Sequence, residues 1–492
     1  EHVMQTLLAL AALHLESPLR GEVFAEMQHK HSLMVVNDIF PMAEGIIARH
    51  TVNRILVLRA LVPSVGYTYM ELVSFSRGSE LYVRPLPKEL DGMPFAASCR
   101  LFPDAVVCGI NTKGQYSHVI PSGNYRFNRG DSLVMLATSV KGADTVREGN
   151  KNAEEPRGLQ ADHKFDNLVM PDGQLKLGPS VSGPKVVLVL GFPSDFPDFL
   201  EILDSYLAAN SEVHVLSERP ESSRTEDLRR HFGDAMMTLD PGSVLKRIKV
   251  VHHFGSTQCK WAIKQMPLDS ADCAIILSES HKDEPLIACD SRNLTSIITL
   301  RSLLPKDKTR KKCKVVIELI HPKSQQVVNG NSSIRRHGSF VYSTSLETAV
   351  FALASEEKTV YNILTNLLST DSAKGHIVVI PCRDFVRGTE DLSFVDLHAR
   401  VFRTSGGILL GWRRTTSHYP IINPSDKEKA LDWSESRADD LIVFCMAPVA
   451  ETISLHTQLP AHEAAQDASL LPLCEPPGCL VGEVNPIKKE PP

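Results

Sequence analysis

Short apolar runs alternate with amphipathic stretches between residues 185 and 368. The runs have the length and β-branched content of strands, and they are Val186–Gly191, Glu212–Ser217, Ile248–His252, Cys273–Ser278, Lys314–Ile320 and Phe340–Ser343. They do not alternate in polarity, so we expect both faces of each strand to be buried, as in a parallel sheet covered by helices. Stretches such as Asp198–Ala208 and Ser256–Gln265 have the helical spacing for that cover. The pattern predicts a doubly wound, Rossmann-like α/β lobe.

A long helix and a small α+β lobe are predicted after this sheet. Apolar residues recur at helical spacing from Leu346 to Leu368, Ser345 is the expected N-cap, and Glu347 lies in the first turn, where the helix dipole favours an acid. The small lobe is predicted to contain a strand, a helix, a strand, a turn and a strand, at His376–Ile380, Ser393–Phe402, Gly407–Trp412, Asn423-Pro424 and Asp440–Cys445.

The same order of elements occurs earlier in the chain. We expect a strand at Glu71–Phe75, a helix at Pro94–Leu101, and strands at Ala105–Ile110 and Asp131–Ala137. Ala105-Val-Val-Cys-Gly-Ile110 matches Gly407-Ile-Leu-Leu-Gly-Trp412, and Ala25-Glu26-Met27 matches Ile317-Glu318-Leu319. The period of roughly 300 residues is far longer than a solenoid repeat and indicates duplicated domains.

The two copies are unequal in length. Only a helix at Met4–Leu15 and the run Val23–Met27 come before the expected swapping helix around Val36–Leu61. The first copy therefore lacks about four of the strands that a doubly wound lobe contains. Such a sheet would expose an apolar edge, so we expect the chain to be a fragment of a longer protein and its first lobe, expressed in this form, to aggregate.

These patterns divide the chain into six expected segments. Residues 139–183 have the Gly, Pro, Asn and charged composition of a linker, and residues 447–492 that of a Pro-rich disordered tail. The other segments are a truncated first Rossmann-like lobe with its swapping helix (1–70), a first small α+β lobe (71–138), a second Rossmann-like lobe with its swapping helix (184–370) and a second small α+β lobe (371–446).

Composition narrows the function classes. The 492 residues are 42% hydrophobic and 23% charged, and the net charge of -5 argues against a broadly basic nucleic-acid binder. No apolar run approaches the roughly 20 residues of a spanning helix. The ten cysteines include no CxxC pair, and Cys108, Cys273, Cys289 and Cys445 lie in apolar runs, as buried thiols of a reducing compartment do. Cys474 and Cys479 lie in the tail.

The loop after the first strand of the large lobe departs from a dinucleotide fingerprint. Glycines are needed there so that backbone N–H groups can approach a pyrophosphate, but the loop reads Gly191-Phe-Pro-Ser-Asp195. Glu218 ends the second strand, where a ribose-binding acid would lie. Gly191, Asp195 and Glu218 thus form a degenerate cofactor loop, and NAD binding of the usual kind is disfavoured.

Acidic residues at strand ends are the candidates for ligand binding. Glu318 and Glu26 end matching strands, at the edge where doubly wound folds bind ligands. Calcium needs six to eight oxygens, so one glutamate is insufficient and a solvated acid remains the alternative. Asp290 and Arg292 share a helix, and they form either an ion pair at a lobe interface or an exposed pair worth roughly 0–1 kcal/mol.

Other candidate chemistry is weaker. His252 and His253 are adjacent on a strand and therefore point to opposite faces, which disfavours a shared zinc site with Cys259. No nucleophile motif and no Walker-type loop occurs in the sequence. We therefore do not expect an enzyme.

The whole pattern resembles tandem RCK domains (regulators of potassium conductance). Four stretches resemble the Castor/Pollux family of plant-type ion channels, and these are Leu286-Ile-Ala-Cys-Asp-Ser-Arg-Asn-Leu294, Val315-Val-Ile-Glu-Leu-Ile-His-Pro-Lys323, Ser345-Leu-Glu-Thr-Ala-Val-Phe-Ala-Leu353 and Ala105-Val-Val-Cys-Gly-Ile110. The resemblance extends from about Gln5 to Cys445, apart from the linker. His321 departs from it, because the family usually has an acidic residue there.

The resemblance implies a soluble gating ring under a cation pore, with potassium as the expected ion. It implies a homotetramer assembled through the RCK lobes, pore helices upstream of this chain, and a nuclear or plastid envelope. Glu26, Glu318, Asp290, Arg292 and Glu347 are the regulatory candidates. No obligate cofactor and no nucleic-acid partner are expected, and calcium is the candidate ligand. The alternative is a soluble NAD(P)-binding oxidoreductase on the same doubly wound fold.

Overall fold

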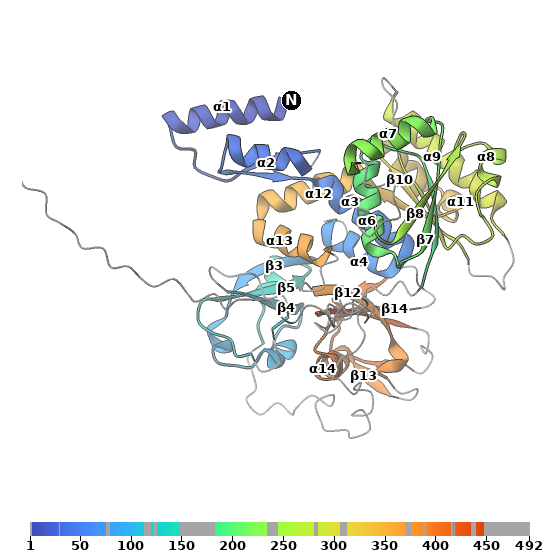
Figure 1. Cartoon of the computed structure of the whole chain (residues 1–492). Coiled ribbons are helices and arrows are strands. Elements are labelled where there is room, and N and C mark those ends of the chain that lie inside the picture. Colours follow the sequence, from blue (N-terminus) through green and yellow to red (C-terminus); the bar gives the residue numbers. More distant parts are fainter. Residues whose placement is uncertain are drawn as a thin grey trace, which may run out of the picture. The chain divides into compact units, whose positions relative to one another are not determined.

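Six parallel strands form the sheet of the large lobe in the computed structural model, on the right in Figure 1. The strands are β6 (Val186–Leu190), β7 (Ser211–Ser217), β8 (Ile248–Phe254), β9 (Cys273–Ile276), β10 (Lys314–Leu319) and β11 (Ser339–Tyr342), in the sheet order β11-β10-β9-β6-β7-β8. In chain order this is 6-5-4-1-2-3, the arrangement of dinucleotide-binding folds. The predicted α/β class is confirmed, and the predicted strand ends lie within two residues of the observed ones.

The structure describes most of the chain. The described residues are 2–28, 30–74, 79–112, 120–121, 125–147, 183–233, 245–279, 284–305, 312–369, 375–386, 390–414, 417, 419–433 and 439–446. Most of the predicted linker and the whole predicted tail lie outside these ranges. Within them, no helix combines the length and the hydrophobicity that a membrane crossing requires.

Helices cover both faces of the sheet. One face packs on α6 (Phe196–Tyr206) and α7 (Glu221–Phe232), and the other packs on α8 (Lys260–Lys264) and α9 (Leu286–Leu303). Alternate residues of β6 enter the two cores, with Val187 and Val189 in one and Leu188 and Leu190 in the other. Two shorter helices, α10 (Pro322–Gly330) and α11 (Ser332–Arg335), connect β10 to β11. The predicted helix at Ser256–Gln265 is wrong in length, because only Lys260–Lys264 is helical.

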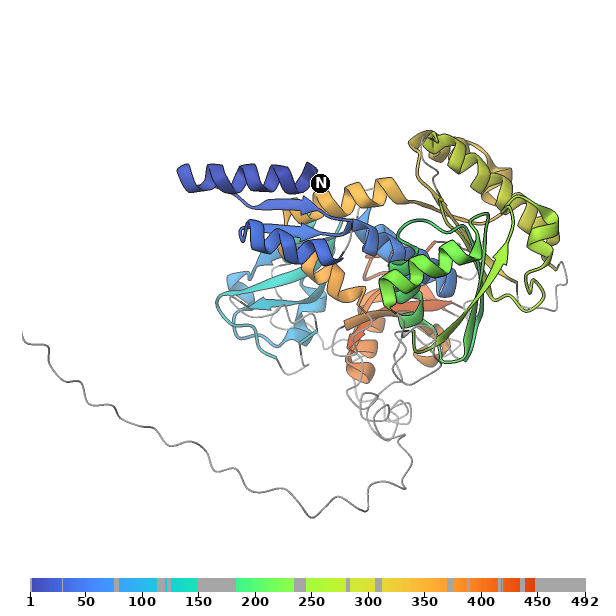
Figure 2. The ribbon, with the colours of Figure 1, turned by 45° about the horizontal axis from the view of Figure 1, so that its top comes forward.

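The first copy contains a two-stranded parallel sheet, β1 (Val23–Glu26) with β2 (Ala43–Ile46). Helices α1 (His2–Glu16) and α2 (Lys30–Ile39) pack on it around a small core that includes Leu7 and Val36 (Figure 2, dark blue). Glu26 pairs with Ile46, as Glu318 of β10 pairs with Val341 of β11, so the predicted match between these strands is confirmed.

The predicted swapping helix around Val36–Leu61 is wrong as a single element. Helix α2 ends at Ile39 because the residue before Pro41 is pushed out of helical backbone geometry, and β2 follows. Helix α3 (Ala48–Leu61) then begins, and α4 (Pro63–Val73) starts after a break at Val62. Proline again explains this break, since Pro63 takes the first helical position and Val62 before it is outside helical geometry, with φ of -130° and ψ of 80°.

The predicted long helix of the second copy is likewise two helices, α12 (Ser343–Glu356) and α13 (Lys358–Leu367). Glu357 separates them in extended geometry, and its side chain caps α13 by accepting the N–H of Thr359 at 3.2 Å. Helices α3 and α12 both have 14 residues, so the duplication extends to these helix pairs. The expected N-cap Ser345 is wrong, because α12 starts two residues earlier at Ser343.

A predicted strand in the first copy is also wrong. Residues 71–73 of the expected strand Glu71–Phe75 belong to α4, and the strand is β3 (Glu80–Pro85). The β-branched and aromatic residues of this segment favour a strand locally, but Tyr69, Leu72 and Val73 are buried on one helix in the core. Tertiary burial here outweighs the local preference.

The two small lobes share their sheet and one of its irregularities. In the first, β3 pairs with β5 (Asp131–Ala137), which pairs with β4 (Ala105–Thr112). In the second, β12 (Gly375–Pro381) pairs with β17 (Asp440–Met446), which pairs with β14 (Ile408–Arg413). The register shifts between Val107 and Gly109 in one lobe and between Leu409 and Gly411 in the other, the same place in the matched sequences. A shared bulge supports the predicted duplication.

The remaining elements are short except for one helix. They are α5 (Val140–Asp144), α14 (Phe394–Ser405), β13 (Asp391–Ser393), β15 (Ile421–Ile422), β16 (Ala430–Asp432) and 3₁₀ turns at Lys88–Leu90, Phe95–Arg100 and Cys382–Asp384. The predicted helix at Pro94–Leu101 is thus a 3₁₀ turn, whereas its counterpart in the second lobe, α14, is a full helix. The start of the predicted linker is helical, since α5 lies there.

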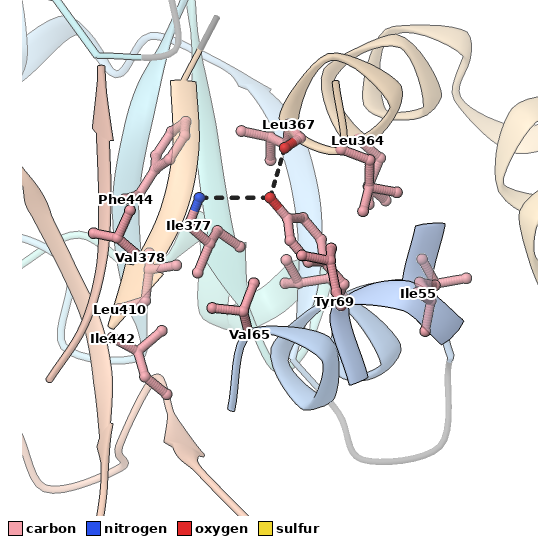
Figure 3. Packing of buried hydrophobic residues seen from close by; sticks show 14 of the residues in the cluster. Ile55, Val65, Tyr69, Leu364, Leu367, Ile377, Val378, Leu410, Ile442 and Phe444 are labelled. Atoms are coloured by element: carbon pink, nitrogen blue, oxygen red, sulfur yellow. Dashed lines mark hydrogen bonds between the residues drawn. The ribbon is translucent and has the colours of Figure 1, made fainter. Parts of the chain in front are cut away.

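The two copies interlock through α4. The hydroxyl of Tyr69 donates to the carbonyl of Leu367 at 2.6 Å, at the end of α13, and the same oxygen lies 3.5 Å from the backbone nitrogen of Ile377 in β12 (Figure 3). Tyr206 of α6 donates to the next carbonyl, that of Leu368, at 2.7 Å. Two buried tyrosines from different copies therefore satisfy the last carbonyls of α13.

Candidate functional site

The carboxyl ends of the parallel strands meet at one edge, and Glu318 lies there at the core of the lobe. Its side chain is fully buried near the end of β10. The backbone N–H of Ser278, just after β9, donates to Oε2 of Glu318 at 2.8 Å, and the hydroxyl of Ser343, the first residue of α12, donates to Oε1. The predicted candidate Glu318 is therefore a buried, hydrogen-bonded carboxylate at the ligand-binding edge of the sheet.

A cation from the other copy completes this arrangement. Arg49, in the first turn of α3, pairs with Oε1 of Glu318, and its Nε donates to Oδ2 of Asp195 at 2.8 Å. Its Nη1 also lies 3.5 Å from Oε1 of Glu347 in α12, and Asn53 donates to the same Asp195 oxygen at 2.9 Å. We call Arg49, Asn53, Asp195, Glu318 and Glu347 the Arg49 cluster.

Charge and burial compete within the Arg49 cluster. Burial acts to lower the pKa of Arg49, but the carboxylates of Glu318 and Asp195 outweigh it and keep that pKa above its usual value. Burial acts to raise the pKa of Asp195, yet the Arg49 charge and the hydrogen bond from Asn53 leave it lowered. Burial raises the pKa of Glu347, with further contributions from the charges of Glu318, Glu26 and Asp195, against the opposing effect of Arg49.

Four residues that the sequence singled out are thereby brought together. Glu318, Glu347 and Asp195 contact Arg49, and Glu26 is close enough for its charge to act on Glu347. Sequence reasoning missed Arg49 itself. Its only signal is a cation in the first turn of a helix, where the dipole disfavours positive charge, and such a cation is unremarkable until its acidic partners are known.

Asp290 and Arg292 bind different partners. Asp290 is fully buried, and its two oxygens accept the N–H groups of Ile320 and His321 at 2.9 and 2.8 Å, which fixes the turn after β10. Arg292 pairs with Glu284 at 2.6 Å and donates to the carbonyl of Glu279. The expectation of an exposed pair is wrong for Asp290, and the contacts described for both residues lie within the large lobe.

The position of a dinucleotide pyrophosphate is taken by the protein itself. Gly191 has φ of +105°, and a Cβ on it would lie 2.7 Å from the carbonyl oxygen of Leu277, so glycine is required where β6 and β9 approach each other. The backbone N–H of Phe192 donates to the carboxylate of Glu279 at 3.0 Å. A carboxylate thus uses the donor that a phosphate would need.

The remaining space at this position is small. The crevice lined by Gly191, Glu218, Glu279 and Arg292 has a cavity volume of about 20 Å³, which is room for one or two water molecules. The Phe192 ring stacks on Phe196 with centroids 4.3 Å apart. This geometry supports the expectation that the loop with Gly191 and Glu218 is a degenerate dinucleotide-binding loop. Asp195, the third residue of that expectation, belongs to the Arg49 cluster.

The histidine pair has two different surroundings. His253 lies 3.0 Å from His214 on the neighbouring strand, and burial lowers the pKa of His252 to about 4 with a further contribution from Arg224. Cys259 is exposed. Cys108, Cys273, Cys289 and Cys445 are buried, as predicted, and burial raises the pKa of each thiol.

Comparison with solved structures identifies the fold. The chain matches the human SLO3 gating ring with a TM-score of 0.63 at 12% identity, over 91% of this chain and 85% of that one. Identity at this level shows a shared fold and nothing about ligand or ion. The predicted tandem RCK arrangement is confirmed as a fold.

Sequence comparison identifies the relatives. Residues 49–152 match a family described as "Castor and Pollux, part of voltage-gated ion channel". "Probable ion channel SYM8" of Pisum sativum is 24% identical over 463 residues, which is 88% of this chain and 48% of that protein. "Ion channel DMI1" of Medicago truncatula is 24% identical over 469 residues, 89% of this chain and 49% of that protein. "Ion channel CASTOR" of Lotus japonicus is 22% identical over 462 residues, 88% of this chain and 50% of that protein.

The chain spans about half the length of these curated relatives. The match to these relatives covers both copies of the duplicated unit. The resemblance read from the sequence is confirmed: over most of its length the chain is similar to proteins named as Castor and Pollux ion channels.

Proposed function

We propose that the chain is the regulatory, gating-ring part of a Castor/Pollux-like cation channel, with potassium as the expected ion. Its sequence relatives are named ion channels, and it shares the fold of a gating ring. In this proposal two RCK-like units respond together to a ligand, and their movement is passed to a pore. The channel acts in a membrane, for which the nuclear or plastid envelope is our proposal.

The insertion of α3 into the large lobe carries this proposal. Helix α3 belongs to the first copy, yet it packs against α6, β9 and β10 of the second, and Val52, Ile55 and Leu56 are fully buried there. Its first turn places Arg49 among acids at the ligand edge of the sheet. Any ligand that competes for those acids has to displace Arg49, and this would move α3 relative to the large lobe.

Calcium is the candidate ligand for this competition. The carboxylates of Glu318, Asp195 and Glu347 are oxygen donors of the kind that calcium binds, and Arg49 now neutralises them. Calcium needs six to eight oxygens, so the side chains would have to rearrange or water would have to contribute. Such a ligand shifts the gating equilibrium only by its differential affinity for the two states.

We propose a homotetramer assembled through the RCK lobes, as expected for a ring under a pore. Light scattering on the purified chain should then give about four times its mass of 54.3 kDa. A monomer at concentrations well above those in the cell would contradict assembly through these lobes alone.

The test is electrical recording from membranes that contain the protein to which this chain belongs. Cation currents should vary with calcium or another ligand on the side that this region faces, and Arg49→Gln should shift the ligand concentration for half-maximal response. Glu226→Gln, on the exposed face of α7, is the matched control and should leave the response unchanged. Currents that do not change with ligand concentration, and that are the same in the parent and in Arg49→Gln, would refute the regulatory role.

The alternative, an NAD(P)-binding oxidoreductase, has the strand order in its favour. The carboxylate of Glu279 and the small crevice beside Gly191 count against it. Calorimetry with NAD and NADH decides between the two, because micromolar binding accompanied by turnover would reverse our order of preference.

A further inference from the structure

Four side chains of metal-ligand type meet where α3 packs on the large lobe, and none of them belongs to the Arg49 cluster. Asp198 and Glu201 lie one turn apart on α6, His231 lies near the end of α7, and one ligand atom from each of these three residues lies within 4.8 Å of the other two. The fourth, His50, follows Arg49 in the first turn of α3, and its Nε2 lies 3.5 Å from Oδ1 of Asp198.

The spacing suits a small tetrahedral cation. Oδ1 of Asp198 is 3.5 Å from Nε2 of His50 and 4.0 Å from Nε2 of His231, and the latter is 3.7 Å from Oε1 of Glu201. Ligands about 2.0–2.1 Å from a tetrahedral zinc ion lie roughly 3.3–3.4 Å from one another. The ligand atoms of Asp198, Glu201 and His231 already lie within 4.8 Å of one another, and a rotation of the His50 side chain, which contacts Asp198, would add a fourth ligand.

A second observation points to a ligand here. Nε2 of His50 is buried and takes part in no hydrogen bond with the described residues, although buried polar nitrogens are almost always satisfied. The side chain of Asp198 in front of it is only 5% exposed. A cation held between them would satisfy the imidazole nitrogen and neutralise the carboxylates together.

We propose that His50, Asp198, Glu201 and His231 form a binding site for a zinc-class divalent cation that ties α3 of the first copy to α6 and α7 of the second. Two imidazoles with two carboxylates suit zinc, whereas calcium prefers sites built from oxygen alone. Four protein ligands leave no open position, which is typical of a structural site and not of a catalytic one.

Ion pairing of protonated histidines is the alternative explanation of this group. It requires only the protein and predicts no response to metal. The metal site stands apart from the proposed gating function, because binding is measured on the chain itself and involves residues outside the Arg49 cluster.

The test is calorimetry on the whole 492-residue chain after chelator treatment, with zinc and calcium chloride titrated separately. One zinc ion per chain should bind at micromolar affinity or tighter and raise the melting temperature. His231→Gln and His50→Gln should each weaken zinc binding by at least tenfold. His253→Gln, at a half-buried histidine on strand β8, and Glu226→Gln, at an exposed residue on α7 itself, are the matched controls and should bind zinc as the parent does.

The ligand type is tested with a second metal. Because Cys259 is exposed, cobalt is used as a spectroscopic probe, and the expected spectrum lacks thiolate-to-cobalt charge transfer. Three results for zinc would overturn the proposal: binding that survives His231→Gln, binding that is lost equally in His253→Gln, and cobalt spectra that show thiolate absorption. A site that binds calcium instead of zinc, and loses calcium in His231→Gln, would also overturn it. His231 is partly exposed, so its variant should fold even if a change at the buried Asp198 does not.

Discussion

Replacing Arg49 by methionine removes the one cation of the Arg49 cluster and keeps most of its apolar stem. Glu318 then remains fully buried with a negative charge, and in the described part of the chain only the Ser278 N–H and the Ser343 hydroxyl still donate to its carboxylate. Asp195 retains only Asn53 among its side-chain partners described here. We expect α3 to loosen from the large lobe, because its first turn no longer offsets these charges.

The size of the effect follows from burial. Removing one partner of a buried ion pair costs about 3–5 kcal/mol. The side chain of Arg49 is 20% exposed and that of Glu318 is 0% exposed, so water can relieve part of the loss and about 3 kcal/mol is the expected figure. The double variant Arg49→Met with Glu318→Gln should recover part of it, since no uncompensated charge is then buried.

Hydrogen exchange measured by mass spectrometry is the suitable assay, because a chain with several lobes does not unfold in one step. A loss of about 3 kcal/mol should speed exchange of the α3 amides about a hundredfold. Arg84→Met is the matched control, since Arg84 pairs with Asp144 at the surface at 2.6 Å and exposed pairs are worth about 0–1 kcal/mol.

The pH dependence gives a second readout. The pKa of Asp195 is lowered in the folded chain, so its stabilisation is present above the ordinary value of 3.8 and is lost as the pH falls through the folded value. The difference between the parent and Arg49→Met should therefore shrink in acid. Unchanged α3 exchange at neutral pH, or a difference that grows in acid, would refute this account of the Arg49 cluster.

Two further predictions concern the interlocked lobes. Tyr69→Phe leaves the Leu367 carbonyl without its 2.6 Å hydrogen bond and should destabilise the end of α13 by about 1–3 kcal/mol, which is measured as faster hydrogen exchange of the α13 amides; exchange at the parent's rate would contradict it. Burial lowers the pKa of Lys427 to about 7, while its Nζ donates to the Ala105 carbonyl at 2.6 Å. The folded chain then binds fewer protons than the unfolded one between about pH 7 and 10.5, so this residue makes stability rise with pH across that window. Lys427→Met should remove that rise, and an identical pH slope in parent and variant would count against it.

Much of the fold could be predicted from the sequence, because its signals are local. The strands of the large lobe are continuous apolar runs, and such runs are recognised within a short window whatever the rest of the chain does. The duplication was visible for a similar reason, since Gly109 and Gly411 occupy the same place in two matched segments and accompany the same bulge. Glu26 and Glu318 were found because they end matching strands.

Tertiary structure decided where helices break and which side chains meet. Residues 71–73 look like part of a strand, yet packing of Tyr69, Leu72 and Val73 into a shared core makes them helical. Arg49 and Glu318 lie 269 positions apart in the chain, and no periodicity connects them. Their contact exists only because α3 of one copy is buried against the sheet of the other, and burial of this kind depends on the whole fold and not on any local preference of the sequence.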